Sequence, residues 1–323
     1  MPSRTTAAAT PAAALLCAFL LAAPAEASAP ASVIPVTDAG ELRDALASAQ
    51  PGDTFDLADG TYRGTFSTTS PGEADAPVTL TGSTDARLTT SGGGYGLQLD
   101  GAPHWRLTGF TVSGGQKGIV LDRSDDVHLD GVTVEDLDME GVHWRNSSSD
   151  GSIRNSTVRN TGHDGRGMGE GVYVGSAGGT DDRSDNVVIE GNTLGPGIGG
   201  ENIDVKEGTT GTRILGNTLD GDGLTGANYD DSWVDIKGND VLVEGNTGTR
   251  TTNDGYQVHQ QEPGWGCGTV FRDNHSDLTG AVGPDRYAIN VTDYDAQSCP
   301  ATVADSNTVV GGKGLTDPGV PVG

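Results

Sequence analysis

The chain places its hydrophobic residues in short stretches of three to five positions, in which apolar and polar residues alternate. Gly, Asn or Asp stands at the ends of most of these stretches. Alternation with a period of two is typical of β-strands, and the flanking residues are typical of turns. The pattern therefore predicts many short strands and very little helix.

Two phrases recur among these stretches. The first phrase begins with an apolar residue, has Gly or Asn at its third position and has Thr at its fifth. Its copies begin at Leu107, Leu129, Ile153, Ile189, Ile214 and Val243. The second is a short strand, and its first apolar position falls at 97, 119, 142, 172, 203, 234, 256 and 289. Repetition of this kind indicates a fold of stacked, equivalent units.

The spacing of the second phrase favours one architecture. Successive copies are 22, 23, 30, 31, 31, 22 and 33 residues apart, so the minimum is near 22 and loops add eight residues or more. One coil of a parallel β-helix needs about 20 residues and tolerates loops that leave the stack. A β-propeller blade needs about 40 residues, and a β-sandwich needs no fixed phrase. We therefore predict an all-β, right-handed parallel β-helix, a solenoid.

The two ends of the predicted solenoid differ from its coils. Asp38 and Glu41 have the spacing of a capping box. Apolar residues follow them at helical intervals, namely Leu42, Ala45, Leu46 and Ala49. We expect one short helix that covers the first coil, a single domain over residues 28–323 with coils at about 54–310, and a poorly ordered tail from about residue 311.

The N-terminal segment has the features of a secretory signal peptide. Arg4 precedes an apolar run at residues 12–23, which is too short to span a bilayer, and Ala25-Glu26-Ala27 fits a cleavage site. We expect residues 1–27 to be removed and the mature protein to be extracellular. It would then keep two cysteines, Cys267 and Cys299, which we expect to form a disulfide in an oxidising compartment.

Composition narrows the classes of partner. Asp and Glu number 45 against 19 Lys and Arg, a formal charge of −26, which excludes binding of a nucleic-acid backbone by bulk charge. The 51 Gly residues show no collagen period and suit turns between strands. Only four residues are lysines. We expect a monomer that binds a polysaccharide and neither nucleic acid nor a membrane.

Stacking of the second phrase gathers titratable residues on one face. Equivalent residues on neighbouring coils lie about 4.8 Å apart in such a stack. The outward-facing middle row reads Gln98, Val120, His143, Tyr173, Asp204, Asp235, Gln257 and Asn290, and the row after the strands includes Arg145, Lys206, Lys237 and His259. A row before the strands reads Glu140, Glu170, Glu201, Ser232 and Asp254. Long insertions at 161–170, 176–185 and 220–232 flank this region and are candidate walls of a groove.

The concentration of these side chains predicts a functional site. We single out Lys206, Lys237, Arg145, His143, Tyr173 and His259 as candidate catalytic residues, with Asp204, Asp235 and Gln257 as supporting residues. The alternative is a solvated ladder of ion pairs between Asp204, Lys206, Asp235 and Lys237, with little energetic weight. The Asn residues of the first phrase, Asn192, Asn217 and Asn246, are expected to form turns or stacked amide ladders.

Three segments resemble polysaccharide lyase family 6, the chondroitinase B and alginate lyase family. They are Glu201-Asn-Ile-Asp-Val-Lys206, the following coil at residues 233–246, and the opening at residues 41–62. The resemblance implies a pectate-lyase-like β-helix, a proton-accepting Lys206 and a calcium ion with Glu201 as a ligand. Gly199 stands where the family has a second acid, and Lys237 where it has an arginine. Glu170 and Tyr173 are the candidates for the family's Asn ligand, and we count Glu170 with Glu201 as candidate calcium ligands.

The expected chemistry is β-elimination on a uronic-acid polymer. The enzyme must neutralise the uronate carboxylate, remove the C5 proton and protonate the leaving oxygen. Lys237, Arg145 or calcium suits the first task, Lys206 the second, and Tyr173, His143 or His259 the third. Three alternatives stay open: a glycoside hydrolase that uses Asp204 and Asp235 as paired carboxylates, a C5-epimerase, and a non-catalytic glycan-binding or adhesive β-helix.

Overall fold

The computed structural model describes residues 1–3, 5, 33–292 and 294–323. The apolar run and cleavage site of the predicted signal peptide lie outside the described residues. From Val33 onward, the described residues belong to one compact unit. None of the helices in the described part of the chain is long and apolar enough to cross a membrane.

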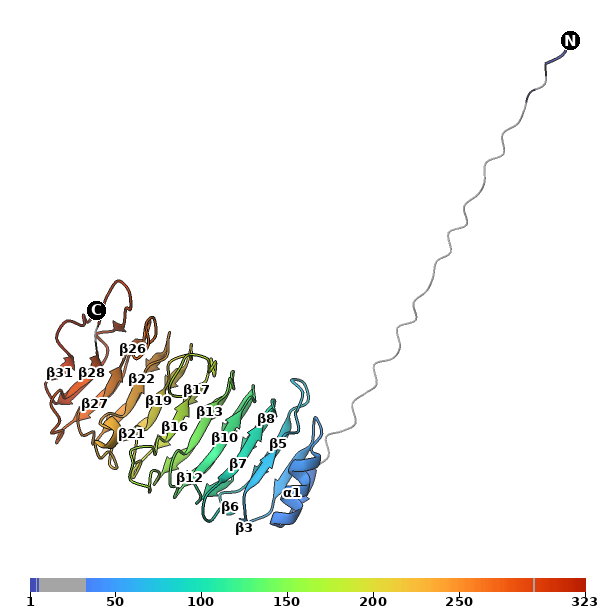
Figure 1. Cartoon of the computed structure of the whole chain (residues 1–323), viewed down its shortest axis with the longest axis horizontal. Helices are drawn as coiled ribbons and strands as arrows, with labels where there is room; N and C mark the ends of the chain where they lie inside the picture. Colours follow the sequence, from blue (N-terminus) through green and yellow to red (C-terminus); the bar gives the residue numbers. More distant parts are fainter. Residues whose placement is uncertain (4, 6–32, 293) are drawn as a thin grey trace. The chain divides into compact units, whose positions relative to one another are not determined.

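Over the described residues, short strands form three parallel sheets that wind into a β-helix (Figure 1). Sheet A contains β1 (Val33–Val36), β2 (Thr54–Leu57), β5 (Val78–Gly82), β8 (Trp105–Thr108), β11 (Val127–Asp130), β14 (Ser152–Arg154), β17 (Val188–Glu190), β20 (Arg213–Leu215), β23 (Leu242–Glu244), β26 (Val270–Arg272) and β29 (Thr302–Val303). Sheet B contains β3 (Gly60–Arg63), β6 (Ala86–Thr89), β9 (Thr111–Ser113), β12 (Thr133–Glu135), β15 (Thr157–Arg159), β18 (Thr193–Leu194), β21 (Thr218–Asp220), β24 (Thr247–Thr249), β27 (His275–Leu278) and β30 (Thr308–Gly311). Sheet C contains β4 (Phe66–Thr68), β7 (Tyr95–Asp100), β10 (Lys117–Asp122), β13 (Val142–Arg145), β16 (Val172–Val174), β19 (Ile203–Val205), β22 (Val234–Ile236), β25 (Tyr256–Val258), β28 (Tyr287–Val291) and β31 (Gly314–Thr316).

The strand register confirms the stacking predicted from the repeat. Sheet C pairs the first apolar residues of the second phrase in one row: Leu97, Ile119, Val142, Val172, Ile203, Val234, Tyr256 and Ile289. These side chains are almost fully buried, and together with those of sheets A and B they fill the interior of the coils. The alternating pattern therefore separates a continuous apolar core from an outward-facing polar row.

A ladder of buried asparagines runs along the inside of the turns, as expected for the first phrase. The Nδ2 groups of Asn192, Asn217, Asn246 and Asn274 each donate to the Oδ1 atom of the next rung, at 2.9–3.0 Å, and Asn307 ends the ladder. Each rung also accepts a backbone N–H from the preceding coil. The ladder satisfies buried polar groups that the tight turns would otherwise leave without partners.

The helix α1 (Ala39–Ser48) covers the first coil, at the blue end of the stack in Figure 1. Asp38 caps it, because its Oδ1 atom accepts hydrogen bonds from the backbone N–H groups of Gly40 and Glu41. The Glu41 carboxylate reaches back to Thr37 and not to Asp38, so only half of the expected capping box is formed. Leu42, Ala45 and Leu46 are the buried residues of the helix.

The C-terminal segment differs from the disordered tail indicated by its Gly and Pro content. Strand β31 pairs with β28 through Tyr287 opposite Gly314 and Ile289 opposite Thr316. Val320 is buried, and the Asp317 carboxylate accepts the N–H of Val291. The last coil offers unpaired backbone groups at its edge, and these pairings satisfy them although the local sequence favours strands poorly.

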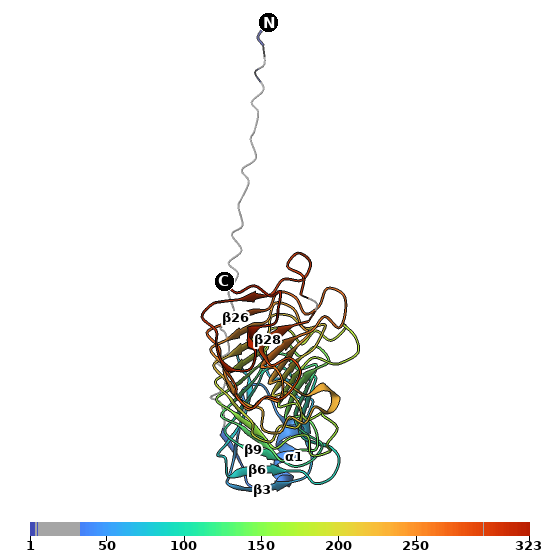
Figure 2. The same cartoon turned by 90° about the vertical axis from the view of Figure 1, so that its left-hand side faces the viewer.

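Long loops leave the coils and project from one side of the stack in Figure 2. One carries the short 3₁₀ helix η1 (Ala227–Tyr229). The predicted disulfide is present and joins Cys267 to Cys299, so that it connects the loops that follow β25 and β28. The Arg183 guanidinium lies over the Trp265 ring at 5.4 Å, which ties the 176–185 loop to the loop after β25.

Candidate functional site

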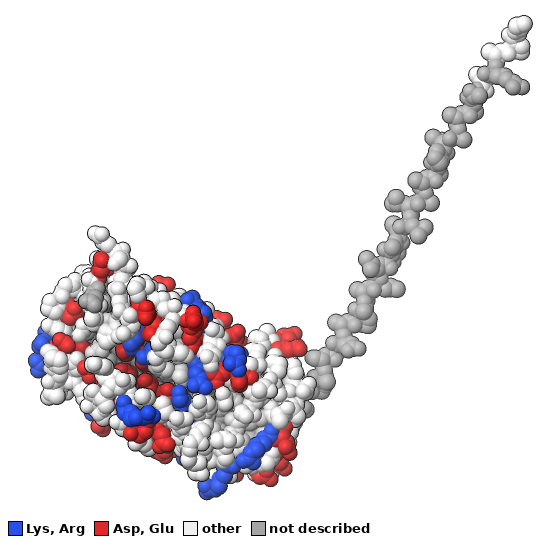
Figure 3. Space-filling view, viewed as in Figure 1, with Lys and Arg blue, Asp and Glu red and all other residues white. Residues whose placement is uncertain are grey.

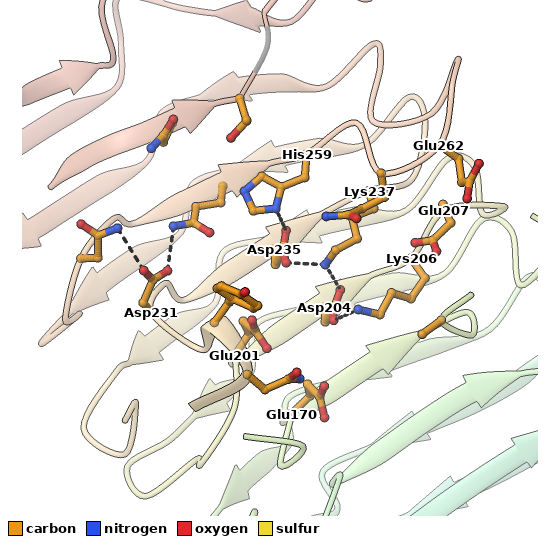
Figure 4. Close-up of a pocket in the computed structure, with 18 of the residues that line it drawn as sticks. Glu170, Glu201, Asp204, Lys206, Glu207, Asp231, Asp235, Lys237, His259 and Glu262 are labelled. Carbon is orange, nitrogen blue, oxygen red and sulfur yellow. Dashed lines mark hydrogen bonds and ion pairs between the residues drawn. The ribbon is translucent and has the colours of Figure 1, made fainter. Parts of the chain in front are cut away.

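A cavity of about 720 Å³ opens on the outer face of sheet C, over the coils of β16 to β28 (Figure 4). All three of the loops predicted to form walls contribute to its lining: Glu170 comes from one, Ala177 and Gly178 from the second, and Tyr229 from the third. The recessed part of this face exposes acidic side chains beside basic ones in the space-filling view (Figure 3).

The floor of the cavity is an ion-pair network from two adjacent coils. Asp204 and Asp235 are paired across β19 and β22, as the repeat predicts. The Lys206 ammonium lies 2.5 Å from Asp204 Oδ2, and the Lys237 ammonium lies 3.2 Å from Asp204 Oδ1. Lys237 also contacts Asp235 Oδ2. Asp204 therefore binds both lysines, whereas Lys237 alone has two carboxylate partners.

The network is covered by the walls and is not the solvated ladder of the alternative interpretation. The side chains of Lys206 and Lys237 are only 12% and 9% exposed. Burial alone would lower the pKa of Lys237, but the Asp204 and Asp235 carboxylates outweigh it and raise the pKa well above its ordinary value. Lys237 therefore stays positively charged.

Two further carboxyl groups stand beside Asp204, and neither has an ion-pair partner among the described residues. Glu170 and Glu201 are each only 6% exposed, and the buried Oε2 atom of Glu170 has no partner. Burial and the charges of Asp204 and Glu140 raise the pKa of Glu170 to about 8. Burial and the charges of Asp204 and Asp235 also raise the pKa of Glu201. This pair needs a proton or a cation to compensate its charge.

These residues suit a calcium ion in their chemistry. Glu170, Glu201 and Asp204 each offer a carboxylate oxygen, and these oxygens lie within 4.8 Å of one another. Calcium binds carboxylate oxygens. The buried Oε2 atom of Glu170 makes no hydrogen bond and is therefore available as a calcium ligand. Both oxygens of Asp204 face lysines, so Glu170 and Glu201 would be the main protein ligands.

Tyr173 lies beside Lys206 on the preceding coil. The Lys206 ammonium sits 5.1 Å from the centre of the Tyr173 ring. Tyr173 is 8% exposed and packs edge-on against His143 at 4.3 Å. Burial, followed by the charges of Asp204 and Glu170, raises the pKa of Tyr173, so its hydroxyl keeps its proton.

His143 and Arg145 do not line the cavity, although the sequence places them in its rows. The Nε2 atom of His143 contacts the Gly175 carbonyl at 2.9 Å, and Nδ1 lies 3.3 Å from the Lys117 ammonium. Burial and Lys117 lower the pKa of His143, which makes it a neutral, fully partnered core histidine. The Arg145 guanidinium forms a two-point ion pair with Asp122.

His259 and Gln257 are at the cavity, as the sequence indicates. His259 Nδ1 lies 3.4 Å from Asp235 Oδ1, and the His259 side chain is 25% exposed. Gln257 donates to Asp231 and Asp254 at 2.8 and 3.0 Å. Asp231 was not among the candidates, because it lies in a loop without periodicity and no register places it.

Lys117 was also missed, although the register contained the signal. It stands two positions before Ile119, in the same row as Glu140 on the next coil, and its ammonium lies 2.8 Å from the Glu140 carboxylate. This pair compensates the charge of Glu140. Glu170 and Glu201 follow in the same row, and that row holds no lysine beside them, because Lys206 and Lys237 stand in the row after the strands.

Known proteins support the fold and identify the family. The sequence family described as the right-handed β-helix region matches residues 95–233. The crystal structure of pectate lyase Pel9A aligns with a TM-score of 0.55 and 15% identity over 77% of this chain and 68% of its own. PfbA, a surface adhesin of Streptococcus pneumoniae, aligns with a TM-score of 0.57 and 14% identity over 87% of this chain and 75% of its own. At these identities the likeness concerns the fold alone.

A much closer relation exists to an alginate lyase from Paenibacillus sp. strain FPU-7. Its crystal structure aligns with a TM-score of 0.78 and 36% identity, over 90% of this chain and 97% of that one. Curated protein sequences contain no match to this chain. The predicted right-handed, pectate-lyase-like β-helix and the predicted polysaccharide-lyase class are thereby confirmed. The chain belongs to the family of β-helical polysaccharide lyases that includes this alginate lyase.

Proposed function

We propose that the protein is a secreted lyase that cleaves a uronic-acid polymer by β-elimination, with Lys206 as the base. The observation that carries the proposal is the pair of lysines that share Asp204 on the cavity floor, in a chain 36% identical to an alginate lyase. That identity makes alginate the first substrate to test. The Cys267–Cys299 disulfide is compatible with an extracellular location.

The two lysines have different tasks because their surroundings differ. Lys237 is held by two carboxylates and stays charged, which suits it to bind the uronate carboxylate and to stabilise the negative charge that develops beside it. Within the part of the chain that the structure describes, Lys206 has only Asp204 as an ion-pair partner, and it lines the cavity. With one carboxylate partner instead of two, it is the lysine that we assign as the base.

The elimination then proceeds without any redox step. In its neutral amine form, Lys206 accepts the C5 proton of the uronate at Nζ, and the electrons of the C–H bond form the C4–C5 double bond. The bond between C4 and its glycosidic oxygen breaks, and that oxygen receives a proton. The products are an unsaturated uronate at one new end and an ordinary hydroxyl at the other.

Tyr173 is the better-supported proton donor. It lies next to Lys206, and its hydroxyl carries a proton that the leaving oxygen can take. His259 contacts Asp235, and the Lys237 ammonium lies between Asp235 and Asp204 (Figure 4). His259 is therefore farther along the stack from Lys206 than Tyr173 is. Tyr173→Phe should therefore reduce kcat far more than His259→Gln. A calcium ion held by Glu170, Glu201 and Asp204 would supply a further positive charge toward the substrate carboxylate.

The hydrolase alternative has less support. A retaining hydrolase needs one protonated carboxyl group in its pair. Burial opposes ionisation of Asp235, but Lys237 and His259 outweigh it and lower the pKa of Asp235. Asp204 accepts contacts from two lysines. Asp235 is thus held as a charge, and Asp204 is occupied by its two lysine contacts, so the pair lacks the protonated carboxyl group that a retaining hydrolase needs.

The decisive experiment is incubation of the purified protein with alginate, polymannuronate-rich and polyguluronate-rich fractions, pectate, polyglucuronate and glycosaminoglycans. A lyase produces an ultraviolet-absorbing unsaturated uronate, whereas a hydrolase produces only reducing ends. We expect absorbance to rise with alginate. Reducing ends without any such absorbance on every polymer would rule out the lyase.

A further inference from the structure

One exposed aromatic side chain stands at the edge of the cavity. Tyr229 lines the cavity, and 87% of its surface is exposed. It is the only aromatic residue among the exposed large hydrophobic side chains of the described residues; of the four tryptophans, Trp105, Trp144 and Trp233 are fully buried and Trp265 is partly buried. Exposure therefore sets Tyr229 apart from the large aromatic side chains that fill the core.

The backbone holds Tyr229 in an unfavourable conformation. Asn228 and Tyr229 have φ angles of +53° and +67°, in the left-handed region. Asn tolerates this region, but a bulky residue such as tyrosine rarely adopts it. Nothing in the packing compensates for the strain at Tyr229, because its ring is exposed. Strained residues of this kind are often retained at ligand-binding sites.

Contacts on both sides of Tyr229 anchor the backbone of its loop. Asn228 Nδ2 donates to the Gly167 carbonyl at 3.2 Å, which ties this loop to the neighbouring wall. Gly167 is needed there, since a Cβ atom at this position would collide with the Ala227 carbonyl. On the other side, the buried Asp230 carboxylate accepts the N–H of Thr225 at 3.1 Å. The loop is thus anchored at both sides of Tyr229, and its backbone holds this residue at the edge of the cavity.

The cavity lining explains why an uncharged contact would matter. Eight carboxyl groups line the cavity, against two lysines and one histidine. A polyuronate that enters gains attraction from the lysines and repulsion from most other charged groups. An aromatic ring offers a flat apolar surface for the C–H face of a pyranose, and this contact does not depend on charge.

We propose that Tyr229 is a binding platform for a pyranose ring of the polysaccharide, beside the sugar at which the bond is broken. This inference rests on the proposed function in assuming a saccharide ligand. The ring contributes through its face and not through its hydroxyl, so Phe can replace it. The strain in its backbone is the stability cost of holding the ring in the cleft.

Affinity electrophoresis in native gels that contain alginate, pectate or a neutral glucan tests the platform separately from catalysis. The comparison uses the wild type and the Tyr229→Ala, Tyr229→Phe and Tyr229→Gly variants, run in the cold. We expect Tyr229→Ala and Tyr229→Gly to weaken retardation by the best-bound polymer about 5- to 10-fold, and Tyr229→Phe to stay within about twofold of the wild type. Val282→Ala is the matched control, because Val282 is 84% exposed and does not line the cavity.

Thermal unfolding separates a binding role from a structural one. Gly adopts positive φ freely, so Tyr229→Gly should unfold at a midpoint equal to or above that of the wild type while it binds less tightly. Equal retardation of wild type and Tyr229→Ala, or no retardation of the wild type by any polymer, would overturn the platform. Retardation that is lost as strongly in Tyr229→Phe as in Tyr229→Ala would overturn it too, by making the hydroxyl and not the ring face the contact. If a polymer retards the wild type but the wild type cleaves no uronate polymer, the proposed lyase function is wrong, and the binding role of Tyr229 is unaffected.

Discussion

Lys206 and Lys237 differ by one carboxylate partner, and this difference can be tested by arginine substitution. Arginine keeps its proton at any working pH, so Lys206→Arg preserves the charge beside Asp204 but cannot accept the C5 proton. We expect Lys206→Arg and Lys206→Ala to lower kcat on alginate by at least about 100-fold. Lys237→Arg retains a fixed cation and should keep substantially more activity. The measurement is the initial rate of unsaturated-product formation, with circular dichroism to verify folding.

The outcome for Lys206→Arg distinguishes a base from a simple cation. If this variant kept a tenth or more of the wild-type kcat, the proton would have to be removed by another group. Lys206→Ala alone would not make this distinction, because it removes the charge and the base together.

The buried carboxyl groups of Glu170 and Glu201 beside Asp204 lead to a prediction about calcium. Since calcium binds the folded site and not the unfolded chain, millimolar calcium should raise the Tm of the wild type, and a chelator should reverse the rise. The Glu170→Gln, Glu201→Gln double variant should lose this response. It should also be at least as stable as the metal-free wild type, because neutral amides do not repel Asp204.

Glu190→Gln serves as the control for this measurement, because Glu190 is an exposed partner of Arg154 on another sheet. It should respond to calcium as the wild type does. An unchanged Tm of the wild type across the calcium titration would show that a proton, and not a metal ion, compensates the acidic pair.

At the scale of the elements, the asparagine ladder connects five successive turns and should carry measurable stability. Asn217 accepts from the backbone and side chain of Asn192, and its Nδ2 donates to the Ile189 carbonyl and to Asn246. Asn217→Ala leaves these buried groups without partners, which costs about 1–3 kcal/mol for each. We expect its free energy of unfolding to fall by at least about 2 kcal/mol with kcat unchanged.

Thr218→Ala is the matched control, because Thr218 is the next residue and its side chain is exposed. It should change the free energy of unfolding by less than about 0.5 kcal/mol. An equally small effect of Asn217→Ala in urea unfolding would mean that the turns are held by the sheets and that the ladder only fills space.

The coils could be predicted to the level of single residues, whereas the loops could not. Parallel in-register pairing places equal repeat positions beside each other, so the repeat was sufficient to bring Asp204 next to Asp235. The same register would have paired Lys117 with Glu140. The register could not show that the Arg145 side chain points toward Asp122 and away from the cavity, because it gives the neighbours of a residue and not the direction of its side chain.

The cover over the lysines and the position of Tyr229 depend on loops without periodicity. The segment at 220–232 is rich in Gly and Asp, and its path is fixed by contacts such as Asn228 to Gly167, which are distant in the sequence. Patterns along one strand carry no information about such contacts. For this reason the sequence indicated a surface-facing Lys206, and the structure has it largely covered.

At the scale of the whole molecule, charge opposes the proposed substrate almost everywhere. The chain has a formal charge of −26, and most of the charged groups that line the cavity are acidic. Lys206 and Lys237 act at short range and are already paired with carboxylates. A polyuronate must therefore approach through a repulsive field before it meets the cations and the ring of Tyr229.

This balance predicts an unusual dependence on salt. The screening length falls from about 30 Å at 0.01 M to about 8 Å at 0.15 M, so salt suppresses the long-range repulsion while buried pairs are affected much less. We expect KM for alginate to fall about twofold or more over this range, with kcat nearly constant. Monovalent salt should be compared with sucrose at equal osmolarity, which should leave KM unchanged. A KM that rises with salt would mean that the local lysines already attract the polymer from a distance, and that the acidic surface does not control its approach.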